Sequence, residues 1–249
     1  MIVDARKIQP DTIINADLCI IGGGSAAISV ALEYLKGGRK VVILPGGGPN
    51  QTAASIDLYR GKVDRQGTHE PLEENRLRMW GGTTTVWGGR CIPFDPIDFE
   101  QRDWVPNSGW PFGLDVLQPY IVRANEISEA GKAEFDARKV FPEKQSEMLR
   151  GFDDENFVTW PLERWSIPTD YSKRYRADLQ AAPNVTVLMH SHAIHLQAAP
   201  DGTRINHVIA ACKPGRNFIV KAHHTVLACG ALENARLMLA ANDVLKEGI

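Results

Sequence analysis

The 249-residue sequence predicts an α/β fold with a mostly parallel sheet. Two short apolar runs, residues 18–21 and 41–44, lack polar alternation, which is typical of strands covered on both faces. Between them, apolar residues recur at spacings of three and four from Ala27 to Leu35, as on one face of a helix that Gly37 and Gly38 would end. Parallel strands joined by a helix require a right-handed crossover, so we expect a βαβ unit.

The remaining elements follow the same logic. The middle of the chain is rich in aromatic residues, proline and charge, and we expect a helix there over about 115–131. Regular patterning then returns, with a strand, a three-stranded meander and a late strand running into a final helix. Asp201-Gly202 and Pro214-Gly215 supply the meander's turns. We expect these strands at residues 185–188, 193–198, 204–211, 217–221 and 225–230.

Charge and composition exclude several classes of binding partner and ligand. The net charge of −2 gives no electrostatic reason to expect nucleic acid or an anionic membrane. The run from Ala16 to Leu35 contains charges and three consecutive glycines, so we expect no membrane span, and a cytoplasmic protein. Four widely spaced cysteines argue against a zinc or dithiol centre, and the histidines around 190–195 have no completing carboxylate or cysteine. We therefore expect no metal.

A glycine turn gives the first functional indication. Gly22 to Ala27 match the G-x-G-x-x-G/A pattern between the two predicted strands. In this pattern Gly22 permits the tight turn and Gly24 lets the backbone approach a pyrophosphate at the start of the helix. The segment therefore predicts a Rossmann-like dinucleotide site.

One usual part of such a site is missing. The second strand is followed by Pro45, where an acidic side chain ordinarily accepts hydrogen bonds from ribose hydroxyls. Asp57 lies too far along the chain to replace this acidic residue. No arginine directly follows the strand, which disfavours a cofactor with a 2′-phosphate.

Three further stretches accompany the glycine turn in order: RMWGGTTTVWGGR (78–90), SGWPFGLDVLQPY (108–120) and TVLACGALENARLML (225–239). Together the four resemble the glucose–methanol–choline (GMC) oxidoreductases, which use FAD. The resemblance implies a Rossmann-like FAD-binding domain with an inserted helical cap segment, and a C-terminal substrate domain largely absent from this chain. It places the first part of the FAD domain at 1–103, the inserted segment at 104–180 and the second part of the FAD domain at 181–249.

The resemblance also implies which residues hold the cofactor. Gly22, Gly24, Ser25 and Ala26 would face the pyrophosphate, and Ala193 would contact adenine. Trp87 is expected either to stack near the flavin or to fill the core. A histidine at the Val86 position forms a covalent flavin bond in some relatives, so valine implies non-covalent FAD. The other expected contacts are Arg78, Gly81, Gly82, Thr83, Val86, Trp87, Gly88, Gly89 and Gly230.

The implied reaction is oxidation of an alcohol, such as a sugar or polyol, with hydride transfer to flavin N5. The family's base is a histidine in a C-terminal segment that these 249 residues do not contain, so no catalytic residue is assigned and the electron acceptor stays open. The chain would then be an N-terminal part of the enzyme, lacking a C-terminal half or working with a partner chain. Two alternatives stay open: a non-catalytic flavin-binding subunit, and an NAD-dependent enzyme using only the first βαβ unit.

Overall fold

The computed structural model describes residues 1–65, 67–143 and 157–249. The chain forms two compact units, which we describe separately. The sheet unit comprises Met1–Val86 and Asp170–Ile249, and the central unit comprises Trp87–Thr169. The domain boundaries expected from the sequence, after residues 103 and 180, fall inside these units.

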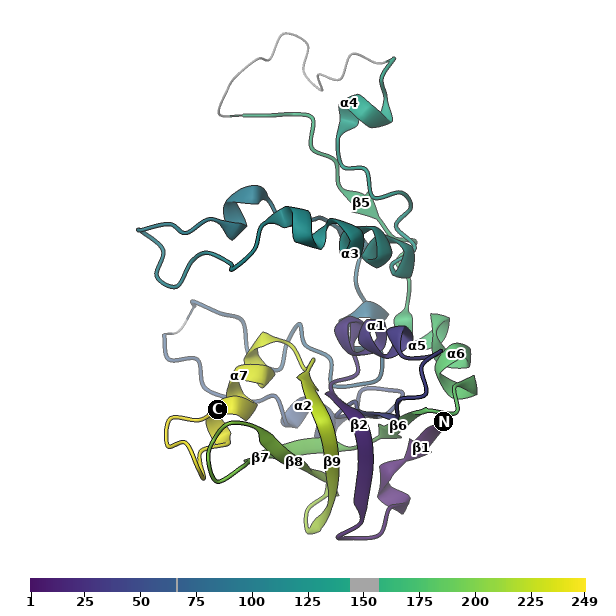
Figure 1. Ribbon diagram of the computed structural model, residues 1–249, viewed down its shortest axis with the longest axis vertical. Coiled ribbons are helices and arrows are strands. Elements are labelled where there is room, and N and C mark those ends of the chain that lie inside the picture. Colours follow the sequence, from purple (N-terminus) through teal and green to yellow (C-terminus); the bar gives the residue numbers. More distant parts are fainter. Residues whose placement is uncertain (66, 144–156) are drawn as a thin grey trace. The chain divides into compact units, whose positions relative to one another are not determined.

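A seven-stranded sheet forms the core of the sheet unit (Figure 1), in the order β1-β6-β3-β2-β9-β8-β7. The first five strands of that order run parallel, and β8 and β7 continue antiparallel. This confirms the mostly parallel α/β fold. The strands are β1 (Ile2–Asp4), β2 (Ile13–Ile21), β3 (Val41–Leu44), β6 (Val185–Met189), β7 (His192–Ala198), β8 (Ile205–Lys213) and β9 (Arg216–Leu227).

The predicted βαβ unit is present. β2 pairs in parallel with β3, and helix α1 (Ser25–Glu33) connects them. All four residues of β3 and the last four of β2 are buried, as expected of strands covered on both faces. On one face, Cys19 and Ile21 belong to a core cluster that includes Leu237 of α7 (Ala231–Ala240). α1 also contacts β2 and packs beside α6 (Arg176–Ala181) (Figure 1).

Two strand predictions were wrong in extent. β2 begins at Ile13, not at residue 18, and the third meander strand and the late strand are one continuous strand, β9. Pairing explains both, because β9 follows β2 from Ile219 to Leu227 while its first part also pairs with β8. The meander turns carry Gly202 and Gly215 at φ 70° and 73°, as their sequences indicate.

The end of α1 also differs from the prediction. The helix stops at Glu33 rather than at Gly37, and Leu35 lies in a turn. The Asn184 side chain, distant in sequence, donates hydrogen bonds to the carbonyls of Tyr34, Gly37 and Arg39 at 2.7–2.8 Å. These contacts hold the backbone in turns where the helix would otherwise continue.

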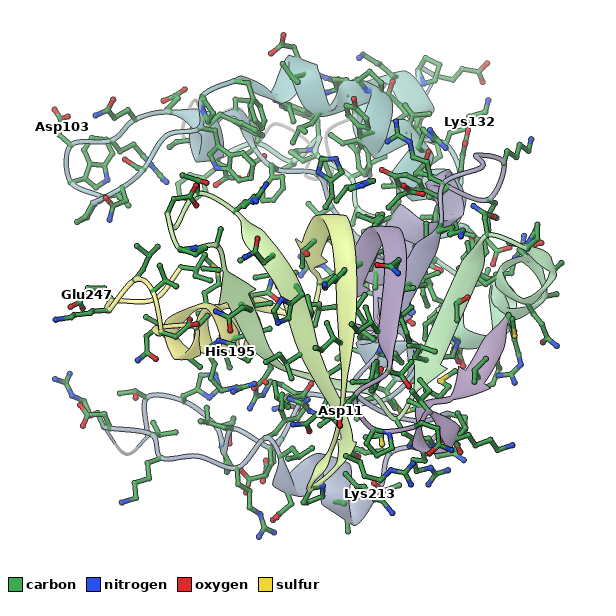
Figure 2. The ribbon with its side chains drawn as sticks, turned by 60° about the horizontal axis from the view of Figure 1, so that its bottom comes forward. Asp11, Asp103, Lys132, His195, Lys213 and Glu247 are labelled. Atoms are coloured by element: carbon green, nitrogen blue, oxygen red, sulfur yellow. The ribbon has the colours of Figure 1, made fainter. Side chains whose placement is uncertain are left out.

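The periphery of the sheet unit contains shorter elements. The β8–β9 hairpin has Lys213 near its tip and lies beside Asp11, whose backbone N–H donates to the Asn217 carbonyl (Figure 2).

Nowhere in the described ranges is there a helix long and apolar enough to cross a membrane. The further elements of the unit are a 3-10 turn at Ala5–Lys7, α2 (Ala53–Asp57), a 3-10 turn at Gly82–Thr85 and α5 (Tyr171–Arg174).

The central unit is built around short elements and aromatic rings. β4 (Arg90–Cys91) pairs antiparallel with β5 (Arg164–Trp165). Helix α3 (Leu114–Ile127) agrees with the expected helix but ends earlier, because Glu129 and Gly131 turn the chain at positive φ. Among the residues of this unit that the structure describes, the other regular elements are a 3-10 turn at Pro96–Phe99 and α4 (Ala137–Val140). The aromatic rings that cluster in the central unit are those of Phe94, Phe99, Trp110 and Phe112.

Candidate functional site

The glycine turn lies where three strands end side by side. Ile21 pairs with Leu44 of β3 and with Leu227 of β9, so Gly22 emerges between the segments that follow those strands. Gly22 has φ +129°, and its N–H donates to Leu44 O at 2.9 Å. A Cβ at this position would lie 2.1 Å from Ala228 O. Only glycine fits there, which agrees with the tight-turn role predicted for Gly22.

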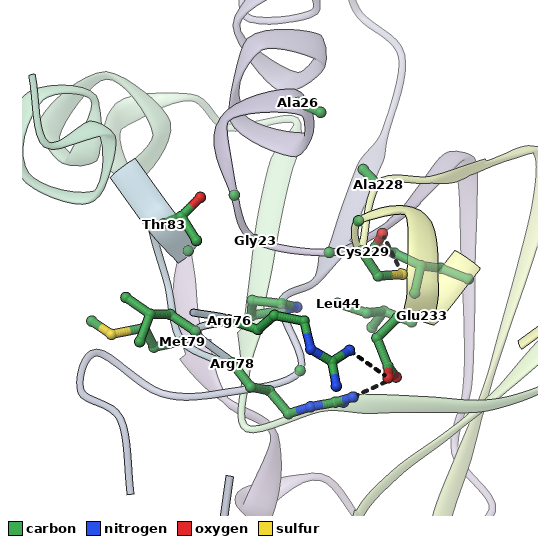
Figure 3. Close-up of a pocket in the computed structure, with 18 of the residues that line it drawn as sticks. Gly23, Ala26, Leu44, Arg76, Arg78, Met79, Thr83, Ala228, Cys229 and Glu233 are labelled. Atoms are coloured by element: carbon green, nitrogen blue, oxygen red, sulfur yellow. Dashed lines mark hydrogen bonds and ion pairs between the residues drawn. The ribbon is translucent and has the colours of Figure 1, made fainter. Parts of the chain in front are cut away.

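A cavity of about 260 Å³ opens at this edge of the sheet (Figure 3). Segments from both halves of the sheet unit line it, far apart in sequence. Nine of the residues predicted to hold a cofactor are among its lining: Gly22, Gly24, Ser25, Ala26, Arg78, Gly82, Thr83, Ala193 and Gly230. Ligand pockets usually measure roughly 300–1,000 Å³, so this space suits the central part of an extended ligand.

Two helices begin at this cavity. Gly24 is the N-cap of α1, and Gly230 is the N-cap of α7. A Cβ at either glycine would meet no atom within 4 Å, so both positions face open space. Because a glycine cap has no side chain, no capping side chain accepts from the backbone N–H groups of either first turn, and these groups are left for another acceptor. Two helix starts at one cavity form a favourable place for a bridging anionic group such as a pyrophosphate.

The loop that follows Arg78 is fixed against the glycine turn. Gly81 N–H donates to Gly23 O at 2.7 Å, and Trp80 N–H donates to Gly48 O at 2.8 Å. Trp80 is buried, and a Cβ at Gly82 would come within 3.0 Å of Gly24 Cα. Backbone therefore packs on backbone here, which explains why the GG pair of the second motif accompanies the first.

Five predicted contacts do not line the cavity. A Cβ on Gly81 would come within 2.7 Å of Ser172, and the Val86 side chain is exposed. The other three belong to the central unit. Trp87 Nε1 there donates to Thr169 O at 3.0 Å, and Gly89 has φ +88° against Ser166. The expected flavin contacts of Trp87, Gly88 and Gly89 stay predictions.

A charged cluster that the sequence did not indicate lines the same cavity (Figure 3). Glu233, in the first turn of α7, receives Arg78 Nη2 at 2.6 Å and Arg236 Nε at 3.1 Å, both on Oε2. Arg76 Nη1 lies 3.4 Å from Oε1. Arg76 and Arg78 also stack over the Tyr59 ring. Since Arg76 and Arg78 lie about 155 residues from Glu233 in the sequence, no local pattern could have revealed that these side chains meet.

Arg78 also reaches the region after β3. Its Nη1 would lie 3.4 Å from a Cβ placed on Gly46, next to Pro45, and both residues line the cavity. Its Nε is buried without a hydrogen-bond partner among the described residues. The fold therefore brings an arginine to the position where the sequence shows none directly after the strand.

The titratable groups near the cavity offer no activated nucleophile. Burial raises the pKa of Cys229 to about 11, and its thiol donates to Ile21 O at 3.2 Å. His192, at the start of β7, has its pKa lowered to about 4 by burial and by nearby Arg78. His195 of β7 (Figure 2) lies 3.3 Å from Asp243. Within the described ranges, no three His, Cys, Asp or Glu side chains gather to hold a metal.

Comparisons with known proteins establish the fold. No family model matches the chain, and no curated protein matches it. Among solved structures, it is similar to pyridoxine 4-oxidase from Mesorbium loti, with 20% identity and a TM-score of 0.59 over 92% of this chain and 52% of that one. An FAD-dependent oxidoreductase from Chaetomium thermophilum matches with 14% identity and a TM-score of 0.60, covering 92% and 48%. The likeness shows a Rossmann-like α/β fold.

A third similar structure is formate oxidase from Aspergillus oryzae RIB40, studied for modification of its FAD. It is 16% identical, with a TM-score of 0.53 over 94% of this chain and 48% of that one. The chain thus spans about half the length of the solved structures it matches.

Proposed function

We propose that the cavity binds FAD non-covalently, and that the chain is the flavin-binding part of an FAD-dependent oxidoreductase acting on the CH–OH groups of sugars, polyols or other alcohols. One observation carries the proposal. Gly24 and Gly230 begin two helices at one cavity, and both face open space there. This arrangement suits a diphosphate held by backbone N–H groups.

The crowded glycines support the same proposal. Gly22 packs against Ala228 O and Gly82 against Gly24, so the backbone itself forms the walls next to the open positions. Such a cradle lets a dinucleotide approach the main chain closely. The cysteine in the lining, Cys229, is not poised for a covalent bond, since its thiol is protonated at neutral pH and hydrogen-bonded to Ile21 O.

The names of the similar structures support an oxidoreductase. They include an FAD-dependent oxidoreductase, a formate oxidase and a pyridoxine 4-oxidase. FAD, when bound, would supply the acceptor for hydride from the substrate carbon. The part of this chain is to bind and orient the cofactor at the carboxyl edge of the sheet.

We place the catalytic base outside the cavity described here. No histidine lines the described cavity, and Glu233 is paired with arginines. The proton acceptor for the alcohol would come from additional polypeptide or from a partner chain, as the GMC resemblance implies. A non-catalytic flavin-binding subunit would use the same cavity without an alcohol substrate.

Ligand titration of the purified chain tests the proposal. We expect the protein to retain or take up FAD, with a bound flavin absorbance maximum at about 450 nm, which is a property of the cofactor. NAD⁺ and NADP⁺ serve as the competing ligands, since Arg78 beside Gly46 could favour a 2′-phosphate. A colourless protein that binds either nicotinamide dinucleotide and not FAD would overturn the assignment.

A further inference from the structure

The strand-end acid of a dinucleotide site is missing at Pro45, yet the cavity contains a carboxylate. Glu233 lines it from the opposite flank, after β9, while Pro45 lines it after β3. The strands β3, β2 and β9 are neighbours, so these two flanks lie two strand spacings apart, or about 10 Å. A glutamate on the first turn of α7 can span part of that width.

Arg78 connects the two flanks. Its Nη2 donates to Glu233 Oε2 at 2.6 Å, and its Nη1 would lie 3.4 Å from a Cβ on Gly46. The Glu233 side chain is 8% exposed and that of Arg78 is 12% exposed. The pair therefore holds a carboxylate in a fixed position beside the segment that follows Pro45.

The two carboxylate oxygens of Glu233 differ in the hydrogen bonds that they accept. Oε2 accepts from Arg78 and Arg236 at 2.6 and 3.1 Å. Oε1 has a longer contact of 3.4 Å with Arg76. Arg76 is already engaged with the carbonyls of Leu72 and Tyr59, so Oε1 retains capacity to accept a further hydrogen bond.

We propose that Glu233 replaces the missing strand-end acid: its Oε1 accepts a hydrogen bond from a hydroxyl of the adenosine ribose, and Arg78 positions the carboxylate. The inference rests on the proposed dinucleotide function of the cavity. Arg78 is a positioning residue here, because it acts through Glu233. The same contact explains how the cavity can keep ribose specificity although Pro45 offers no acceptor side chain.

ADP, 2′-deoxy-ADP and 3′-deoxy-ADP test the contact as competitors of FAD. In the wild-type chain, loss of the contacted hydroxyl should weaken binding roughly ten-fold, as for a hydrogen bond to a charged group. In Glu233→Gln the single amide oxygen should stay with the donors of Arg78 and Arg236, which leaves an NH2 group at the Oε1 position. This variant should therefore bind ADP more weakly by a similar factor and should no longer distinguish ADP from that deoxy analogue. Glu247→Gln, at an exposed position outside the cavity lining, is the matched control and should behave as wild type.

A rescue variant separates ribose binding from a structural role. Pro45→Glu, added to Glu233→Gln, restores an acid at the usual position and should restore discrimination between ADP and the deoxy analogue. If unfolding temperatures show that Glu233→Gln does not fold, Glu233→Asp keeps the charge for the arginines but withdraws the oxygens, and should also lose discrimination.

Two results would overturn the inference while leaving FAD binding intact. One is a wild-type chain that binds ADP and both deoxy analogues equally. The other is a Glu233→Gln or Glu233→Asp chain that binds all three ligands more weakly by the same factor, and so keeps the wild-type discrimination between them. Failure of the wild-type chain to bind FAD at all would instead overturn the proposed function.

Discussion

Gly22 lies directly against the carbonyl of Ala228, since a Cβ on Gly22 would sit 2.1 Å from that oxygen. The two residues follow adjacent parallel strands, and Ala228 N–H donates to Ile21 O at 2.7 Å. The contact joins the turn that begins α1 to the turn that begins α7. This backbone contact therefore links the two helix starts at the candidate cofactor cavity.

Gly22→Ala should destabilise the sheet unit strongly. The substitution combines a left-handed φ of +129° with overlap against the main-chain oxygen of Ala228, a residue held beside β2 by the hydrogen bond from its N–H to Ile21 O. We expect a loss of more than about 3 kcal/mol in the free energy of unfolding. Denaturant unfolding measures it, with Gly38→Ala as control because a Cβ there meets no atom within 4 Å. Equal stability of the two variants would contradict the packing.

Gly24→Val should have the opposite signature. Gly24 has φ −89° and open space around its Cβ direction, so the variant should fold with stability within about 1 kcal/mol of wild type. The branched side chain would fill the place proposed for the pyrophosphate and prevent flavin retention. The measurement is bound flavin per chain, with Gly38→Val as control. Normal flavin content in Gly24→Val would count against the cavity as the FAD site.

His192 should make stability sensitive to acid. Burial, assisted by Arg78 and His190, lowers the pKa of His192 from 6.5 to about 4. The unfolded chain therefore takes up a proton below pH 6.5, whereas the folded protein keeps the imidazole neutral. The contribution of the neutral His192 side chain to the free energy of unfolding is therefore complete above pH 6.5. This contribution is lost as the pH falls from 6.5 toward about 4.

The comparison variant for this prediction is His192→Gln, which does not titrate. Between about pH 7 and about pH 4.5, wild type should lose on the order of 2 kcal/mol more unfolding free energy than the variant. Urea unfolding at several pH values provides the data. Parallel stability curves for the two proteins would show that the pKa of His192 is not shifted.

Asn184→Ala should loosen the end of the βαβ crossover. The Asn184 amide donates to three carbonyls between α1 and β3, and its loss leaves them without that partner. We expect a cost of about 1–3 kcal/mol in unfolding free energy. Asn184→Asp is the matched control, since it keeps the shape but replaces the donor by an acceptor, and it should cost at least as much. A neutral effect of both would show that solvent satisfies these carbonyls equally well.

Local signals in the sequence were enough for the first βαβ unit and for the turn at Gly22. Apolar runs and helical spacing report burial within a single element, so residues 18–21 and 41–44 and the helix between them could be identified. The extra length of β2 and β9 could not. Ile13 to Ala16 alternate in burial, and their strand form depends on pairing with Ile219 to Ala222.

The candidate site divides in the same way. Short glycine-rich motifs in the sequence, read through their resemblance to one family, predicted that glycines at 22, 24, 82 and 230 share one site, and all four line the cavity. Only the tertiary structure decided that Glu233 and Arg78 meet beside Gly46. The physical reason is that backbone conformation is encoded locally, whereas a buried ion pair between residues so distant in sequence forms only after the strands have paired.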